Sequence, residues 1–146
     1  MNRAEQAANL LATSQMNCAQ AVLTAFADEL GLDKDSALRV SQAFGAGMGR
    51  TGGMCGAVTG AYMAIRLRPY EDLLSPLEKK ERVYALVAQF NERFKALHNS
   101  LSCSELLGHD LSTPEGRAAA KETRAGSKIC PALVADAVTI LETLSQ

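Results

Sequence analysis

The sequence has no tryptophan, two histidines and few aromatic residues, which make up 5% of its 146 positions. Surfaces that stack on bases or sugar rings are built from such side chains, so their scarcity disfavours a nucleic-acid partner. The formal net charge is −1. A chain without an excess of basic residues lacks the electrostatic attraction on which binding to a phosphate backbone depends. We therefore expect no nucleic-acid partner.

Long hydrophobic runs are also missing. Residues 54–67 form the longest apolar stretch, and it is shorter than the roughly 20 residues that a helix needs to cross a bilayer. No signal-peptide core follows Met1, because acidic and polar residues occur within the next few positions. We expect a cytoplasmic protein with no membrane insertion.

The apolar content of 47% and the charged content of 21% are typical of a globular chain. The length suits one hydrophobic core, so we expect a single domain over residues 1–146. No segment alternates apolar and polar residues as a half-buried strand does, which predicts an all-α, compact bundle of about six or seven helices. Helices are predicted over residues 3–13, 18–30, 33–44, 54–67 and 75–97 and from 131 onward, with short ones at 102–108 and from 113.

Glycine is concentrated in residues 45–53, where it occupies five of nine positions. This stretch is predicted to be a loop with several positive-φ residues, because glycine adopts such conformations without steric cost. The helix after it, over residues 54–67, is rich in small residues and is predicted to lie at the centre of the bundle. A nucleotide-binding loop is disfavoured, because no strand precedes the glycines and no Gly-Lys-Ser/Thr follows them.

The cysteines carry the strongest functional signal. Four are too few for the disulfide framework of a secreted chain, and in a reducing cytosol they serve more often as ligands, nucleophiles or redox groups. Each is predicted at the start of a helix, the last of them because Pro131 is expected to begin the final helix. The partial positive charge of a helix N-terminus is expected to lower the thiol pKa. The four residues are Cys18, Cys55, Cys103 and Cys130.

No Cys-x-x-Cys pair occurs, so a shared site has to be assembled by the fold from separate helices. Four converging thiolates would suit an iron–sulfur cluster or a soft metal ion, whereas pairs of thiols would suit reversible disulfide chemistry. The only imidazoles, His98 and His109, are candidate ligands or acid–base partners near Cys103. Cofactor-binding candidates in and after the glycine-rich stretch are Gly47, Gly49, Arg50, Gly53 and Gly56.

Five segments resemble the motifs of the family labelled C-GCAxxG-C-C, whose members are described as redox-active. The family label writes Gly-Cys-Ala, whereas this chain has the order Cys-Gly-Ala at residues 55–57. The similarity extends from about residue 17 to the C-terminal region. The segments are NCAQAVL at 17–23, GMGR at 47–50, CGAVTG at 55–60, CSELLG at 103–108 and CPALV at 130–134.

The resemblance implies a redox role for the four cysteines, and we expect a partner protein that exchanges electrons or sulfur with them. A similar domain accompanies haem and an iron–sulfur centre in split-Soret cytochromes c, but this chain has no Cys-x-x-Cys-His motif for covalent haem. Two alternatives stay open: a module that binds or carries a soft metal without redox change, and a helical oligomerisation domain with structural cysteines. We also expect a homodimer, because the amphipathic helix over residues 75–97 is long enough to supply a pairing face.

Overall fold

The computed structural model describes residues 1–70 and 75–144. Within these residues it confirms the all-α prediction, with eight right-handed α-helices, one more than the upper number expected, and a single isolated β-bridge. The α-helices are α1 (Arg3–Thr13), α2 (Cys18–Ala27), α3 (Lys34–Ser41), α5 (Gly56–Leu67), α6 (Pro76–His98), α7 (Cys103–Leu107), α8 (Pro114–Glu122) and α9 (Ala125–Thr143). The 3₁₀ turn η1 (Gln42–Phe44) and the short segment α4 (Gly45–Arg50) connect α3 to α5.

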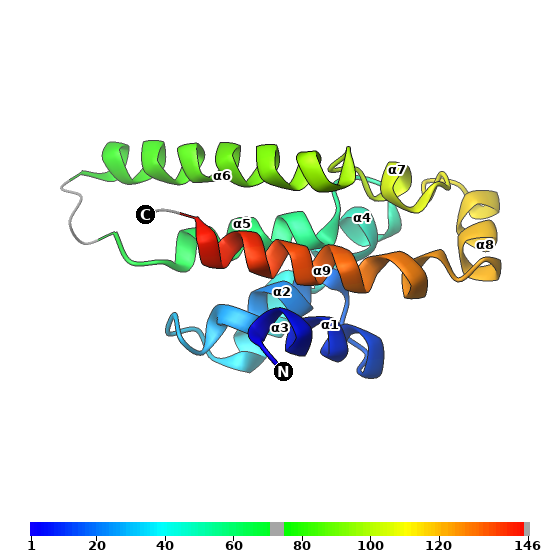
Figure 1. Ribbon diagram of the computed structural model, residues 1–146, viewed down its shortest axis with the longest axis horizontal. Helices are drawn as coiled ribbons and strands as arrows, with labels where there is room; N and C mark the ends of the chain where they lie inside the picture. Colours follow the sequence, from blue (N-terminus) through cyan, green and yellow to red (C-terminus); the bar gives the residue numbers. More distant parts are fainter. Residues whose placement is uncertain (71–74, 145–146) are drawn as a thin grey trace.

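The helices form three layers (Figure 1). Helix α6 lies along one side of the molecule, α1 to α3 lie on the other side, and α5 and α9 run between them. Helices α7 and α8 lie at one end, next to the first turns of α9. In the part of the chain that the structure describes, no helix is both long enough and apolar enough to cross a membrane.

Side-chain caps fix the residues at which the helices around the site begin. The Asn17 side chain accepts a hydrogen bond from the Gln20 N–H at 3.0 Å, and the Gln20 side chain accepts one from the Asn17 N–H. Ser102 accepts a bond from the third N–H of α7 at 3.3 Å. Such caps satisfy N–H groups that have no partner within the helix. Cys18 and Cys103 therefore occupy the first helical positions of α2 and α7, as predicted.

Helix α5 is central, as its small residues predict. Eight of its twelve residues are buried. A Cβ atom added to Gly60 would lie 2.7 Å from the carbonyl oxygen of Ala19 in α2, so the backbones of the two helices are in direct contact. Only glycine permits this approach, because any side chain at residue 60 would meet main-chain atoms that cannot move independently.

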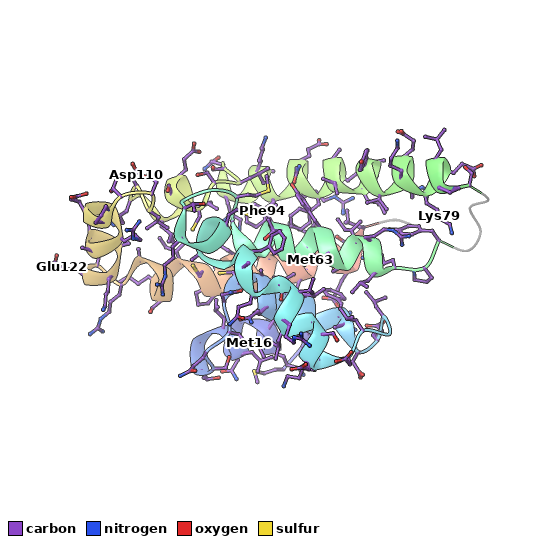
Figure 2. All side chains as sticks on the ribbon, turned by 180° about the vertical axis from the view of Figure 1, so that it is seen from behind. Met16, Met63, Lys79, Phe94, Asp110 and Glu122 are labelled. Carbon is purple, nitrogen blue, oxygen red and sulfur yellow. The ribbon has the colours of Figure 1, made fainter. Side chains whose placement is uncertain are left out.

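Aromatic side chains fill the space between α5, α6 and α9. Phe90 and Phe94 are fully buried, and their stacked rings have centroids 5.7 Å apart. Figure 2 shows Phe94 directed from α6 into the interior. On α6, Leu77 and Tyr84 are 60% and 61% exposed. The pairing of two copies through this helix stays a prediction.

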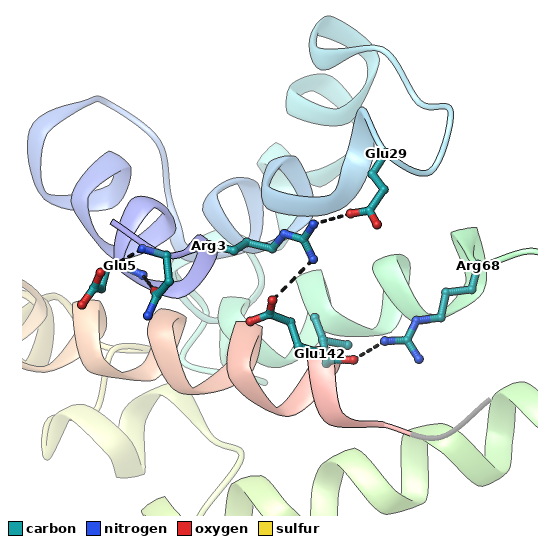
Figure 3. A network of polar contacts seen from close by, with 7 residues as sticks. Arg3, Glu5, Glu29, Arg68 and Glu142 are labelled. Atoms are coloured by element: carbon teal, nitrogen blue, oxygen red, sulfur yellow. Dashed lines mark hydrogen bonds and ion pairs between the residues drawn. The ribbon is translucent and has the colours of Figure 1, made fainter.

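Polar contacts link α1, α2, α5 and α9 (Figure 3). Arg3 forms ion pairs with Glu29 and Glu142, and partly exposed pairs of this kind contribute at most about 1 kcal/mol each. Arg68 is 8% exposed and donates a hydrogen bond to the Leu141 carbonyl in the last turn of α9. Carbonyls in a last turn lack donors within the helix, so the buried guanidinium acts as the cap of α9.

The prediction that Pro131 begins the last helix is wrong. Helix α9 begins at Ala125, and Pro131 lies inside it without an N–H to donate to the carbonyl of Ser127. Packing against α7 and α8 stabilises the first turns in spite of this lost bond. Ala125 is 5% exposed in a small apolar cluster there, and Ile129 packs against the same cluster.

Candidate functional site

All four cysteines line one cavity of about 350 Å³, which is bordered by α1, α2, α5, α7 and α9. We call it the thiol cavity. Five leucines and several smaller apolar residues form most of its remaining wall, and no charged side chain is among them. The fold thus gathers in an uncharged apolar space four thiols that the sequence spreads over more than a hundred residues. The cysteines are Cys18, Cys55, Cys103 and Cys130, and all four are free thiols.

Two backbone hydrogen bonds bring Cys55 and Cys103 together. The Cys55 N–H donates to the Leu101 carbonyl at 2.7 Å, and the Cys103 N–H donates to the Gly53 carbonyl at 2.7 Å. These bonds frame the isolated antiparallel bridge between residues 54 and 102. Each cysteine also begins a helix, Cys55 as the N-cap of α5 and Cys103 as the first residue of α7. The bridge therefore joins two helix starts that are far apart in the sequence.

Glycines allow Cys18 to approach this pair. A Cβ atom on Gly56 would lie 3.1 Å from the Cys18 Cβ, and one on Gly45 would lie 2.1 Å from the Asn17 side chain that caps α2. Asn17 also donates a hydrogen bond to the Gln42 carbonyl at 2.9 Å. The start of α2 is therefore attached to η1 and α4 as well as to α5.

Residues 46–50 form a left-handed turn, with five consecutive φ values between 55° and 71°. Each non-glycine residue in this conformation costs about 1–2 kcal/mol. The Gly47 carbonyl stabilises the turn by accepting hydrogen bonds from the N–H groups of Thr51 at 3.2 Å and Gly53 at 2.9 Å. A Cβ atom on Gly47 would lie 2.6 Å from the Cys103 Cβ. The positive-φ prediction is confirmed, and the turn packs directly on a cysteine.

Cys130 lies in a different local setting from the other three cysteines. Because α9 begins at Ala125, Cys130 is in the interior of the helix and not at its N-terminus, which corrects the predicted position. Its side chain is half-buried, whereas Cys18, Cys55 and Cys103 are buried. Cys130 is therefore the most exposed of the four cysteine residues.

Burial keeps two of the thiols protonated. It raises the pKa of Cys55 to about 11, although the N–H groups of Ala57 and Val58 act in the opposite direction. It also raises the pKa of Cys103 to about 12. The expectation that helix N-termini lower these pKa values is therefore wrong, because the loss of hydration outweighs the favourable N–H groups.

Cys18 and Cys130 interact as a pair. A side-chain interaction with Cys130 raises the pKa of Cys18 well above its ordinary value, and burial raises it further. The same interaction lowers the pKa of Cys130, and burial opposes this change. Of the four cysteines, Cys130 alone has a lowered pKa, so it is the thiol that ionises first.

The raised pKa of Cys55 predicts that the reduced protein loses stability as the pH rises above 9. In the unfolded chain this thiol titrates near 9.0, whereas in the folded chain it stays protonated to about 11. The folded state binds the extra proton in this interval, so the free energy of unfolding falls by up to about 1.4 kcal/mol per pH unit from this group. Urea unfolding of the reduced protein between pH 8 and 10.5 measures the slope. Cys55→Ala should make it shallower by this amount, while Cys103, whose pKa is also raised, still contributes. An equal slope in both proteins would contradict the assignment.

Of the five residues predicted to bind a cofactor, three lie at the thiol cavity or next to Cys103, and two do not. Gly56 lines the thiol cavity, Gly53 supports the bridge to Cys103, and Gly47 packs on that cysteine. Gly49 and Arg50 belong to the left-handed turn and are not part of the cavity wall.

Neither histidine lines the thiol cavity. The His98 ring shares a 2.8 Å hydrogen bond with Asp136 and packs on the Phe94 ring, and the His109 ring shares a 3.2 Å hydrogen bond with Thr123. Both imidazoles are therefore engaged in contacts outside the site.

The leucines of the cavity wall were not identified from the sequence, because their helical spacing is that of ordinary core residues. Among residues 1–70 and 75–144, no three histidine, cysteine, aspartate or glutamate side chains are grouped so that they could hold a metal ion. The thiols as they stand do not form a ligand set.

Comparison with family models gives one match, which covers residues 16–144. The matched family is described as "Putative redox-active protein (C_GCAxxG_C_C)". Comparisons with curated proteins and with solved structures gave no match. The matched range includes all four cysteines and every helix except α1.

Proposed function

The chain belongs to the C_GCAxxG_C_C family, whose description names a redox role, and on that premise we propose that Cys18 and Cys130 form its reversible dithiol/disulfide pair. The observation that carries the proposal is that these two thiols line one cavity and interact there, which raises the pKa of Cys18 and lowers that of Cys130. In such a pair, the sulfur with the lower pKa is the nucleophile that attacks the substrate disulfide. The second sulfur then resolves the mixed disulfide.

The reaction is thiol–disulfide exchange with a disulfide substrate R–S–S–R. The Cys130 thiolate attacks one substrate sulfur, which forms a mixed disulfide and releases the first R–S⁻. The Cys18 sulfur, once deprotonated, then attacks the Cys130 sulfur, which forms the Cys18–Cys130 disulfide and releases the second R–S⁻. Two electrons pass from the protein thiols to the substrate, and the two thiol protons end on the released thiols.

Cys55 and Cys103 have a supporting role in this proposal. Their raised pKa values keep them neutral near pH 7. Neutral thiols in the wall preserve the apolar character of the cavity, and Cys130, whose pKa is lowered, is then the sulfur that ionises most readily. A single buried negative charge is less costly than several close together.

A set of four thiolates around an iron–sulfur cluster or a soft metal ion is the competing proposal, since all four cysteines border one cavity. Four thiolates around a divalent ion carry a net charge of about −2. The cavity wall contains no cationic side chain that would balance this charge. The cysteines would also have to move, because no three donors of the described residues are grouped around a common point. The dithiol proposal requires neither a balancing cation nor a regrouping of the four cysteines around one point.

Disulfide mapping tests the proposal. The reduced protein is exposed to 2-hydroxyethyl disulfide without oxygen, blocked with N-ethylmaleimide, digested and analysed by mass spectrometry. We expect one linkage, Cys18 to Cys130, with Cys55 and Cys103 recovered as alkylated thiols. Another pairing, or no linkage at all, would overturn the proposal. Stoichiometric iron or zinc in protein purified anaerobically would favour the ligand set.

A further inference from the structure

A second hollow lies beside the thiol cavity and is lined by three basic residues, Arg50, Arg117 and Lys121. We call it the cationic hollow. It has a volume of about 500 Å³, and its remaining wall consists of Ala46, Leu111 and Ala118. Two of these, Ala46 and Leu111, also line the thiol cavity, so the two spaces share a wall. The left-handed turn and α8 contribute the basic residues at the same end of the molecule (Figure 1).

None of the three cations forms an ion pair with a carboxylate of the described residues. Ion pairs in residues 1–70 and 75–144 involve Arg3, Arg39 and His98, and none involves a residue of the cationic hollow. Arg117 donates one hydrogen bond, to the Leu111 carbonyl at 3.0 Å, which leaves its charge uncompensated. The chain as a whole has a net charge of −1, so a general excess of basic residues does not explain this grouping.

Acidic residues at the same end of the molecule do not fill the cationic hollow. Figure 2 places Asp110 and Glu122 near α8, but neither lines the hollow. The Asp110 carboxylate accepts hydrogen bonds from the N–H and hydroxyl of Ser112, and these bonds lower its pKa. The hollow therefore offers an unmatched positive charge to a ligand from solution.

The backbone places Arg50 at a conformational cost. Its φ is 67°, in a region that arginine rarely adopts, and it ends a turn of five left-handed residues. Strained backbone of this kind persists where the surrounding structure holds it in place, and it occurs often at functional sites. The hydrogen bonds to the Gly47 carbonyl hold this turn. The same turn therefore fixes Arg50 in the hollow and Ala46 in the wall that the hollow shares with the thiol cavity.

We propose that the cationic hollow binds an oxyanion group of the substrate whose sulfur reacts with Cys130. The substrate class is a small organic disulfide that carries a carboxylate, sulfonate or phosphate group. The inference rests on the proposed dithiol function, and the steps of exchange are those given above. The apolar thiol cavity accepts the sulfur end of the molecule, and the basic residues beside it hold the charged end.

Three small disulfides of similar size test this inference with the full-length reduced protein. They are 3,3′-dithiodipropionate, which is anionic, 2-hydroxyethyl disulfide, which is neutral, and cystamine, which is cationic. The rate of formation of the Cys18–Cys130 disulfide is divided by the rate of each reagent with N-acetylcysteinamide, which removes differences in intrinsic reactivity. We expect the normalised rate to be about 10-fold higher for the anionic than for the neutral reagent, and lowest for the cationic one.

Charge variants localise the effect. Lys121→Gln and Arg50→Gln should each lower the anionic-to-neutral rate ratio several-fold, and added salt should lower it in the wild type. Lys79→Gln removes the same charge from the first turn of α6, at the opposite end of the molecule (Figure 2), and is the matched control, which should keep the wild-type ratio. A wild-type ratio near one, or a ratio that the hollow variants leave unchanged, would overturn the inference. If even the neutral reagent forms no Cys18–Cys130 disulfide, the dithiol function itself fails; if it does so and charge has no effect, only the oxyanion site fails.

Discussion

Cys130→Ala should remove the fast phase of thiol alkylation at pH 8. The pKa of Cys130 lies below the ordinary value of 9.0, whereas that of Cys55 is about 11 and that of Cys103 is about 12. A pKa two units higher leaves about 100-fold less thiolate at a pH below both values. In the variant, Cys55 and Cys103 should therefore react at least about 100-fold more slowly than Cys130 does in the wild type. Cys18 loses the interaction that raises its pKa most, but it stays buried, and burial keeps its labelling slow. Time-resolved iodoacetamide labelling followed by mass spectrometry measures the rate for each cysteine.

Cys55→Ala is the matched control for this experiment. It removes a buried thiol from the same cavity and should leave the fast phase in place, because Cys18, and not Cys55, lowers the pKa of Cys130. The Cys18→Ala variant should, in contrast, change the labelling rate of Cys130. It removes the side chain that lowers the pKa of Cys130, so this pKa should rise and the labelling of Cys130 at pH 8 should slow. Loss of the fast phase in Cys55→Ala would show that the assignment of the reactive thiol is wrong.

Gly60→Ala should destabilise the whole domain. The added Cβ atom would lie 2.7 Å from the Ala19 carbonyl oxygen and 3.1 Å from the Ala19 Cα, both of them main-chain atoms of α2. Helices α2 and α5 would have to separate, and overpacking of this kind costs about 1–3 kcal/mol. Because both helices begin at cysteines of the site, the variant should also disturb the cavity. Urea unfolding monitored by circular dichroism measures the change in free energy.

Gly126→Ala provides a control of opposite sign. Gly126 lies in the first turn of α9, and a Cβ atom there would be 4.0 Å from the Cys130 sulfur, which is an ordinary contact. Replacing a helical glycine by alanine stabilises by up to about 1 kcal/mol where space permits. The two glycine substitutions should therefore shift the midpoint of unfolding in opposite directions. A shift of the same sign and size would contradict the packing described for α5.

Local signals in the sequence were sufficient to predict where most of the helices begin. Asn17 and Ser102 are side-chain caps whose hydrogen bonds depend on residues three positions away, so the starts of α2 and α7 could be predicted. The same holds for the positive-φ character of residues 46–50, since glycines alternate there. These features depend on neighbours in the chain and not on the tertiary fold.

The start of α9 and the acidity of the thiols depend on contacts between distant segments. Pro131 is a strong local signal for a helix start, but packing of Ala125 against α7 and α8 extends the helix toward the N-terminus. The pKa of Cys55 is set by burial, and that of Cys130 by a thiol 112 positions away in the sequence. The site could be predicted as a gathering of four cysteines, but the assignment of roles among them required the fold.

The contact between Cys18 and Cys130 joins α2 to α9, and hence the two ends of the chain. A disulfide at this contact would close a covalent loop that contains most of the 146 residues. In the chain-entropy model, closing a loop of about 100 residues lowers the entropy of the unfolded state enough to stabilise the folded state by about 4–5 kcal/mol. The oxidation state of two sulfurs would then be thermodynamically coupled to the folding of the whole domain, and the folded protein would hold its disulfide more firmly than the unfolded chain.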